Sequence, residues 1–467
     1  MKNLPTINEI LETPLVKGLV SKLSRGEVVS TSLLVLGELA QQTRESALGM
    51  TLPTVTDVAN RIADKLTQDN PARLVRTINA TGKLFPPQLG APPLAQEAIS
   101  AMCELARDYT AMGRPLGAWD NSQQLRSVEF LVNQLVSAES VMAVNSGIAG
   151  WFLVLHALRT LAAEERKTGN SSQTPPNDRP IIISRSHLYE LPPAARVTDI
   201  FAELQLPIIE VGSVNRTTIN DFANAISESS LGIMYVYSGL DSINRTNEIP
   251  GIAELAKLAK SRKTPLIVDI GQCGLIPVKN ELTASECLKN GADLVIMRGV
   301  SLFGGPDCGL ILGKKNILDV CRKDNLASGL LCNPYTLTAL EQTLLLYSQP
   351  DKGVNSIPVQ QIVNFSEANL SNRGKRIAMQ LTASSLVESA EIEIVRESPV
   401  MDKWLSLSLP TCRIAVKPKG ISVEELTKRL AHTTPAVLGV VTADAFIIDM
   451  RTILPQQDIA LTEAFFQ

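Results

Sequence analysis

Aromatic side chains are scarce in this chain of 467 residues: they make up 4% of it, against 45% for hydrophobic residues as a whole. Cations are not in excess either, because 44 Lys and Arg face 47 Asp and Glu. Proteins that bind nucleic acid or anionic membranes usually carry clustered excess cations. The composition therefore predicts neither DNA nor a membrane as a partner. It suits an α/β protein with aliphatic cores, and the length suits two or three domains.

Cysteine and histidine are few and scattered. The chain has seven Cys and three His, and no two cysteines have the close spacing of common zinc sites, so we expect reduced thiols and no metal. The N-terminus lacks a basic segment followed by an apolar run. The longest apolar stretch, residues 141–158, is interrupted by Asn145, Ser146 and His156. We therefore expect no signal peptide, no membrane span and a cytoplasmic protein.

Hydrophobic spacing indicates four parts. They are a helical module of three helices (1–70), a large domain of alternating strands and helices (71–345), a connecting helical segment (346–390) and a small α+β domain (391–467). In the last part Ser422 should cap a helix, with Glu425 closing a capping box.

A strand that ends in small polar residues marks one candidate site. Residues 141–144 are apolar and predict a buried strand, and a helix is expected from Ile148 to Leu158. Between them lie Asn145, Ser146 and Gly147. Backbone N–H groups and the helix dipole attract anions at such a position, although Asn and Ser are also ordinary helix caps.

Two further strands end in chemically informative residues. The apolar run 265–268 leads to Asp269, and a carboxylate at the end of a buried strand is costly unless it has a partner. The apolar run 292–297 leads to a loop with Ser301 and Gly304-Gly305-Pro306, whose glycines permit a tight turn.

The motifs, taken together, resemble bacterial selenocysteine synthase, the L-seryl-tRNA(Sec) selenium transferase family, which uses pyridoxal 5'-phosphate (PLP). The resemblance runs through nearly the whole chain in order. It is carried by Ile78-Asn79-Ala80-Thr81-Gly82, Glu210-Val211-Gly212-Ser213-Val214-Asn215-Arg216-Thr217, Gly304-Gly305-Pro306, Lys417-Pro418-Lys419-Gly420 and Asp449-Met450-Arg451-Thr452.

The resemblance implies a fold-type-I PLP-transferase (aspartate-aminotransferase-like) large domain between the helical N-terminal module and the small C-terminal domain. It also implies a homodimer or larger homo-oligomer, and a pyridinium contact from Asp269 that keeps the ring an electron sink. His187 either stacks on the cofactor or is a structural loop histidine. The implied cofactor-binding residues are Asn145, Ser146, Gly147, Arg185, His187, Asp269, Gly304 and Gly305.

The chain departs from the family at residues that do chemistry. Ser301 stands where the family's lysine carries PLP as a Schiff base, and a hydroxyl cannot form that bond. Covalent attachment is therefore not expected. The chain also lacks other residues of the family. Ala91 stands where the family has an Arg, the loop at 117–122 lacks the family's Arg and His, and Ser328 and Leu331 stand where the family has an arginine pair.

Three functions follow, and whether the chain is an enzyme stays open. The first is a family member without Schiff-base catalysis, acting as a ligand-binding, structural or regulatory homologue. The second is an active PLP enzyme, a transferase or lyase, in which Lys83, Lys279, Lys314 or Lys315 substitutes. The third is selenium transfer to seryl-tRNA itself. Binding of tRNA is doubtful, because the residues up to Asn70 hold seven Lys or Arg and eight Asp or Glu.

Overall fold

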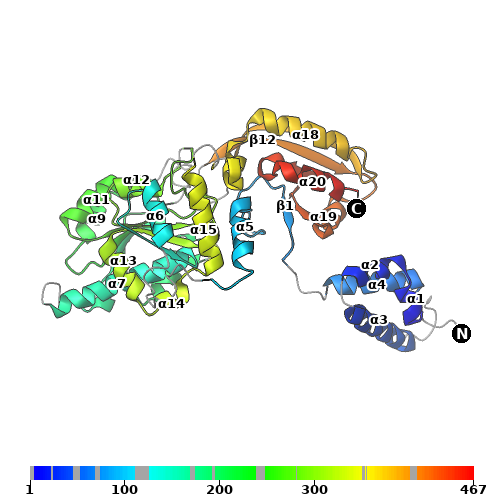
Figure 1. Ribbon diagram of the computed structural model, residues 1–467, viewed down its shortest axis with the longest axis horizontal. Helices are drawn as coiled ribbons and strands as arrows, with labels where there is room; N and C mark the ends of the chain where they lie inside the picture. The colour runs from blue at the N-terminus through cyan, green and yellow to red at the C-terminus, as the bar shows by residue number, and fades with distance from the viewer. Residues whose placement is uncertain are drawn as a thin grey trace. The chain divides into compact units, whose positions relative to one another are not determined.

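The computed structural model divides into two compact units, Met1–Arg76 and Thr77–Gln467 (Figure 1). It describes residues 5–22, 25–45, 53–68, 74–110, 126–168, 174–191, 195–237, 248–279, 281–349, 353, 355–399 and 407–466. Within this part of the chain, no helix has the length and apolar character needed to cross a membrane.

The described residues of the first unit form four helices around a small apolar core. The helices are α1 (Ile7–Leu11), α2 (Pro14–Lys22), α3 (Arg25–Glu45) and α4 (Val55–Gln68). The sequence pattern predicted three. The difference lies at Pro14, which has no N–H to continue α1 and instead opens α2, where a helix needs no such donor. Ile10, Val28 and Ile62 are among the residues buried between these helices.

A seven-stranded sheet is the centre of the second unit. Its order is β2 (Ser140–Val144), β10 (Gly309–Gly313), β9 (Leu294–Arg298), β8 (Leu266–Asp269), β7 (Gly232–Val236), β3 (Ile181–Ser184) and β6 (Ile208–Val211). Strand β10 runs antiparallel to both of its neighbours, and the pairs from β9 to β6 are parallel.

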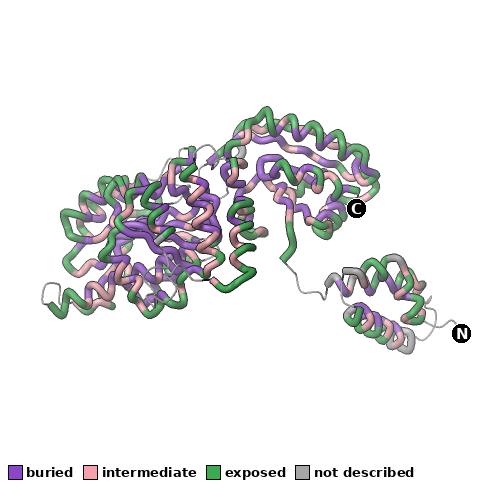
Figure 2. Tube along the Cα trace, in the orientation of Figure 1, coloured by how far each residue is buried: buried purple, intermediate pink, exposed green. Residues whose placement is uncertain are grey.

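Helices cover both faces of this sheet (Figure 1). One layer comprises α6 (Arg126–Leu135), α9 (Ile219–Ala225), α11 (Ile252–Ser261), α12 (Ala284–Lys289) and α15 (Pro334–Tyr347), and α5 (Gln96–Leu105) packs on α15. The other comprises α7 (Gly147–Lys167), α8 (Val197–Glu203) and α13 (Lys315–Lys323). Alternate residues of each strand enter opposite cores, as a pleated strand requires, so Val141 and Met142 are both buried. Figure 2 shows that the strands between the helix layers are largely buried.

A second, antiparallel sheet forms the C-terminal part of this unit. Its strands, in order, are β11 (Val387–Pro399), β12 (Ser408–Pro418), β15 (Phe446–Asp449) and β14 (Val440–Val441). Helices α18 (Glu367–Leu381), α19 (Val423–His432) and α20 (Asp458–Ala464) share its core, and α17 (Pro358–Asn364) precedes them. Strand β1 (Thr77–Asn79) pairs with β13 (Ala436–Leu438), although it precedes the large sheet in the chain. The residue ranges predicted for the four parts of the chain stay a prediction.

Candidate functional site

One edge of the large sheet gathers the residues singled out in the sequence. The parallel strands β9, β8, β7 and β3 end there, and ligands of open α/β sheets bind outside such strand ends. Because β10 is antiparallel, its first residue lies at the same edge, where Gly309 pairs with Val144 of β2 and Arg298 of β9. The Asn145 turn, Asp269 and the Ser301 loop therefore follow strands that end at one edge.

The turn after β2 is a capped helix start. Ser146 is the N-cap of α7, and its Oγ accepts the N–H of Ala149 at 3.1 Å. The exposed Asn145 donates its backbone N–H to Leu330 at 2.7 Å. Amides in the first turn of a helix have no acceptor within the helix. The predicted anion cup therefore has the donors that its chemistry needs.

Arg298 is a cation beside this cup that the sequence reasoning missed. A Cβ built on Gly147, the first residue of α7, would lie 3.0 Å from Arg298 Cγ. The Arg298 side chain is mostly buried, and its Nη2 pairs with Oδ1 of the exposed Asp307 at 3.5 Å. The sequence offered one signal, an arginine ending an otherwise apolar strand.

Asp269 is enclosed, with a donor on each carboxylate oxygen. The residue is 5% exposed. Its Oδ1 accepts the Gly271 N–H at 2.6 Å, and its Oδ2 accepts the indole N–H of Trp151. Burial raises the pKa of Asp269 to about 6, while the bonds from Trp151 and Gly271 and the charge of Arg298 act in the opposite direction.

His187 and Arg185 follow β3 but differ in surroundings. His187 is fully buried and lies edge-on to Tyr235, with ring centroids 4.6 Å apart. Its Nδ1 accepts the Val236 N–H at 3.4 Å, and its Nε2 has no partner among the described residues. Burial lowers the pKa of His187 to about 3, so the ring is neutral. Arg185 is exposed and pairs with Glu210 at 3.1 Å, bracing the ends of β3 and β6.

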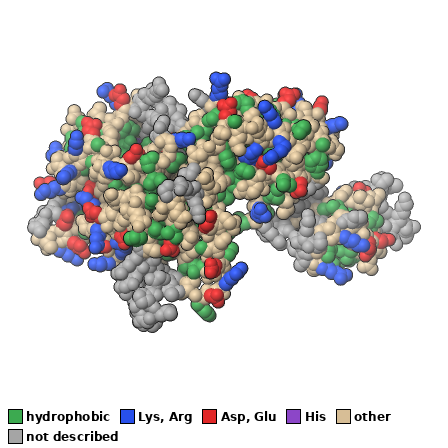
Figure 3. Space-filling view, turned by 45° about the horizontal axis from the view of Figure 1, so that its top comes forward, with side chains coloured by type: hydrophobic (Ala, Val, Ile, Leu, Met, Phe, Trp, Pro, Cys, Tyr) green, Lys and Arg blue, Asp and Glu red, His purple; other side chains and the backbone are tan. Residues whose placement is uncertain are grey.

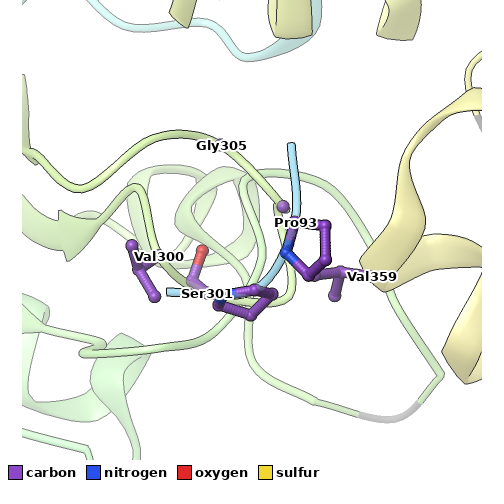
Figure 4. A pocket seen from close by; sticks show the side chains of 7 residues that line it. Pro93, Val300, Ser301, Gly305 and Val359 are labelled. Atoms are coloured by element: carbon purple, nitrogen blue, oxygen red, sulfur yellow. The ribbon is translucent and has the colours of Figure 1, made fainter. Parts of the chain in front are cut away.

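Ser301 is buried inside the loop that joins β9 and β10. Its Oγ accepts the Phe303 N–H at 3.1 Å and lies 3.4 Å from the Gly299 carbonyl. It lines a small hollow, where Val300 and Pro93 flank it (Figure 4). The other lining residues are Pro92, Gly304, Gly305 and Val359.

Most of the chain matches one protein family. Residues 77–454 match the family model described as L-seryl-tRNA selenium transferase. The chain belongs to that family. The L-seryl-tRNA(Sec) selenium transferase of Geotalea uraniireducens (strain Rf4) is 28% identical over 99% of this chain and 98% of that protein. The corresponding protein of Aquifex aeolicus (strain VF5) is 30% identical over 81% of this chain and 80% of that protein.

The fold is shared with a solved structure. The structure of D-glucosaminate-6-phosphate ammonia-lyase superposes with a TM-score of 0.58 at 19% identity, covering 86% of this chain and 96% of that one. At that identity the likeness concerns the fold alone. The prediction of a PLP-transferase-type large domain with a helical N-terminal module and a small C-terminal domain is confirmed.

Membership of the selenium transferase family implies PLP, and the site residues fit such a group. The first turn of α7, beside Arg298, suits a phosphate, and Asn145, Ser146 and Gly147 would hold it there. The buried carboxylate of Asp269 suits a protonated ring nitrogen. The buried Nε2 of His187, which has no hydrogen-bond partner in the described part of the chain, is a further polar atom at this edge of the sheet.

The four lysines proposed as substitutes for a lysine at position 301 lie in different parts of this selenium transferase family member. Lys314 and Lys315 follow the far end of β10, and Lys314 pairs with Asp293 at 2.6 Å. A five-residue strand spans ~16 Å. The two lysines are therefore about one strand length away from the sheet edge at which Asp269 lies. Lys279 is exposed, with φ of 55°. Lys83 donates its backbone N–H to Thr81 Oγ1 at 3.2 Å.

The positions at which the sequence resemblance predicts missing arginines have mixed surroundings. Ser328 in α14 (Ala327–Leu330) and the following Leu331 are both exposed, and Leu331 forms a β-bridge with Val144 beside the Asn145 turn. Ala91 is exposed next to Pro92. The predicted loop at 117–122 lies outside the described residues. The described residues contain no cluster of three or more His, Cys, Asp or Glu that could hold a metal.

Proposed function

We propose that this protein binds PLP without a covalent bond and acts as a ligand-binding, structural or regulatory member of the selenium transferase family. The observation that carries this proposal is Ser301 in the loop after β9. The residue has a hydroxyl instead of an amine, and that hydroxyl is hydrogen-bonded within its own loop. Bound PLP supplies an electron sink, and a lysine is its usual anchor.

The surrounding residues support binding more than selenium transfer. Asp269 and the first turn of α7 retain a carboxylate and anion-binding amides. The positions of three family arginines carry Ala91, Ser328 and Leu331, which remove charges that an anionic selenium or sulfur donor would need. We therefore infer that the chain keeps the groups that bind the PLP cofactor and has lost the cations that would bind a selenium or sulfur donor.

The alternatives are an enzyme that uses another lysine and selenium transfer itself. Lys83 and Lys279 are the candidates for the first alternative, since Lys314 and Lys315 follow the end of β10 that lies away from Asp269. The seven cysteines are free thiols, which fits the cytoplasm that we propose as the compartment.

Replacing Ser301 by Lys tests the proposal. Wild-type protein with PLP should not show the band near ~420 nm of a lysine-linked cofactor, and its PLP should be removed by denaturation after borohydride treatment. Ser301→Lys should gain that band but no turnover of seryl-tRNA. A control variant, Ser301→Ala, should behave like wild type. A lysine-linked band in wild-type protein would refute the proposal, and identifying the modified lysine would establish the second function.

A further inference from the structure

The indole of Trp151 is directed at the carboxylate of Asp269. Trp151 lies in α7, just beyond the capped first turn, and is fully buried. Its Nε1–H, the side chain's only polar group, donates to Asp269 Oδ2. Phe201 of α8 packs edge-on against the ring, with centroids 5.9 Å apart and planes 67° apart. The neighbouring helix thus packs against the indole ring.

The carboxylate keeps acceptor capacity beyond these internal bonds. It receives Trp151 at one oxygen and the Gly271 N–H at the other, whereas an ionised carboxylate has about four lone-pair sites. Two sites therefore remain for a ligand. Burial alone would favour the neutral acid, and a hydrogen bond donated to the charged form counteracts that preference.

Among the described residues, Arg298 on β9 is the cation whose charge acts on this carboxylate. Cys273, in the turn after β8, is a buried thiol influenced by both Asp269 and Glu281. Just after β7, the backbone N–H of Tyr237 donates to the backbone carbonyl of Asp269 at 2.8 Å. Helix α7 presents the neutral indole of Trp151 to the carboxylate. A substitution at Trp151 can therefore remove a hydrogen-bond donor from Asp269 without changing the charge of the site.

We propose that Trp151 is a positioning residue that holds Asp269 as a charged acceptor for a protonated ring nitrogen, so that the cleft selects pyridine-type ligands. The inference rests on the proposed non-covalent binding of PLP. Without a lysine bond, affinity depends on the phosphate contacts and on this ring contact. Charge-assisted hydrogen bonds in buried sites are the stronger kind. Loss of the indole donor should therefore lower the affinity for PLP about tenfold.

Two ligands and two variants separate this role from a packing role. PLP and its carbocyclic analogue, in which the ring nitrogen is replaced by C–H, are titrated into wild type, Trp151→Phe and Phe201→Leu at pH 7.5. Wild type should prefer PLP about tenfold. Trp151→Phe should lose that preference and retain the affinity for the analogue. Phe201→Leu disturbs the same packing but keeps the N–H, so its preference should match that of wild type.

A second measurement needs no ligand. The chain has three Trp, so replacing Trp119 and Trp404 by Phe leaves Trp151 as the only indole emitter. Its fluorescence should change with a midpoint near pH 6, where Asp269 titrates, and the transition should vanish in Asp269→Asn. An emission that is flat from pH 4.5 to 8 would overturn the inference even if Trp151→Phe does not fold.

The outcomes distinguish the two proposals. Equal preference for PLP in wild type and Trp151→Phe overturns the role of Trp151 and leaves non-covalent binding standing. Covalent PLP in wild type overturns the proposed function, whereas a preference lost in Trp151→Phe would still support the role of the indole. Wild type that binds neither ligand overturns both.

Discussion

Asp269 shows how a single residue reconciles burial with charge. A carboxylate taken out of water is costly unless hydrogen bonds or nearby cations compensate. Here two N–H donors and Arg298 provide partial compensation, and burial still raises the pKa of Asp269 to about 6 from a usual 3.8. A protonated ligand nitrogen would supply the missing interaction.

This balance predicts a pH-dependent stability. Because the folded-state pKa of Asp269 lies above its unfolded value, the carboxyl group costs nothing below about pH 3.8 and destabilises the fold as the pH rises through about 6. Asp269→Asn cannot ionise. Its free energy of unfolding, relative to wild type, should therefore rise between pH 4 and 7, by up to ~3 kcal/mol. Urea titrations at several pH values measure this. A relative loss over that range would mean that the fold stabilises the ion.

At the scale of elements, the start of β10 fixes the turn between β2 and α7. A Cβ on Gly309 would lie 2.2 Å from the Ser146 carbonyl oxygen and 2.9 Å from the Gly147 nitrogen. Both are backbone atoms, which cannot rotate away. Gly309→Ala should therefore destabilise the protein by about 2–3 kcal/mol and weaken PLP binding.

Gly329 is the matched control for that substitution. It lies in α14, near the same turn, and no described residue outside its own helical turn and chain neighbours lies within 4 Å of a Cβ built on it. Gly329→Ala should change the stability by no more than ~0.5 kcal/mol. Thermal unfolding of the two variants compares them directly. Equal effects would mean that the contact at Gly309 does not fix the turn.

The sequence predicted the presence of helices α7 and α19 better than it predicted the details of their ends. Ser422 caps α19, and its Oγ accepts the Glu425 N–H at 3.2 Å. The rest of the predicted capping box was wrong, because the Glu425 carboxylate accepts from Arg429 at 3.1 Å instead. Helix α7 continues past the predicted end at Leu158 to Lys167, since no Gly or Pro interrupts it before residue 169 and polar residues continue one exposed face.

Contacts between distant residues were beyond the sequence. Trp151 and Asp269 are 118 positions apart, so no local pattern in the sequence pairs them. Arg298 reaches the first turn of α7 only because β10 brings β2 and β9 to one edge. The pairing of β1 with β13 is likewise a product of topology. The motifs predicted which segments carry the site, and the fold supplied the partners of its side chains.

At the scale of the whole molecule, the balance of charge predicts weak binding to tRNA. Lys and Arg are interspersed with Asp and Glu over the face that Figure 3 shows. The formal net charge is −3, and phosphate binding needs clustered cations that release counterions. The full chain should therefore give no tight complex with tRNA in a gel shift at ~150 mM salt. A tight complex that weakens steeply with added salt would revive selenium transfer as the function.

The homodimer or larger assembly stays a prediction.

The central claim is that PLP is held in this protein without a covalent bond. The most direct measurement is the intact mass of wild-type protein after incubation with PLP and reduction by borohydride, with Ser301→Lys as the positive control. Borohydride fixes only PLP that is bonded to an amine. The account predicts an unchanged mass for wild type and one added cofactor for Ser301→Lys. A single stoichiometric adduct on wild type, removed by replacing one lysine, would contradict it.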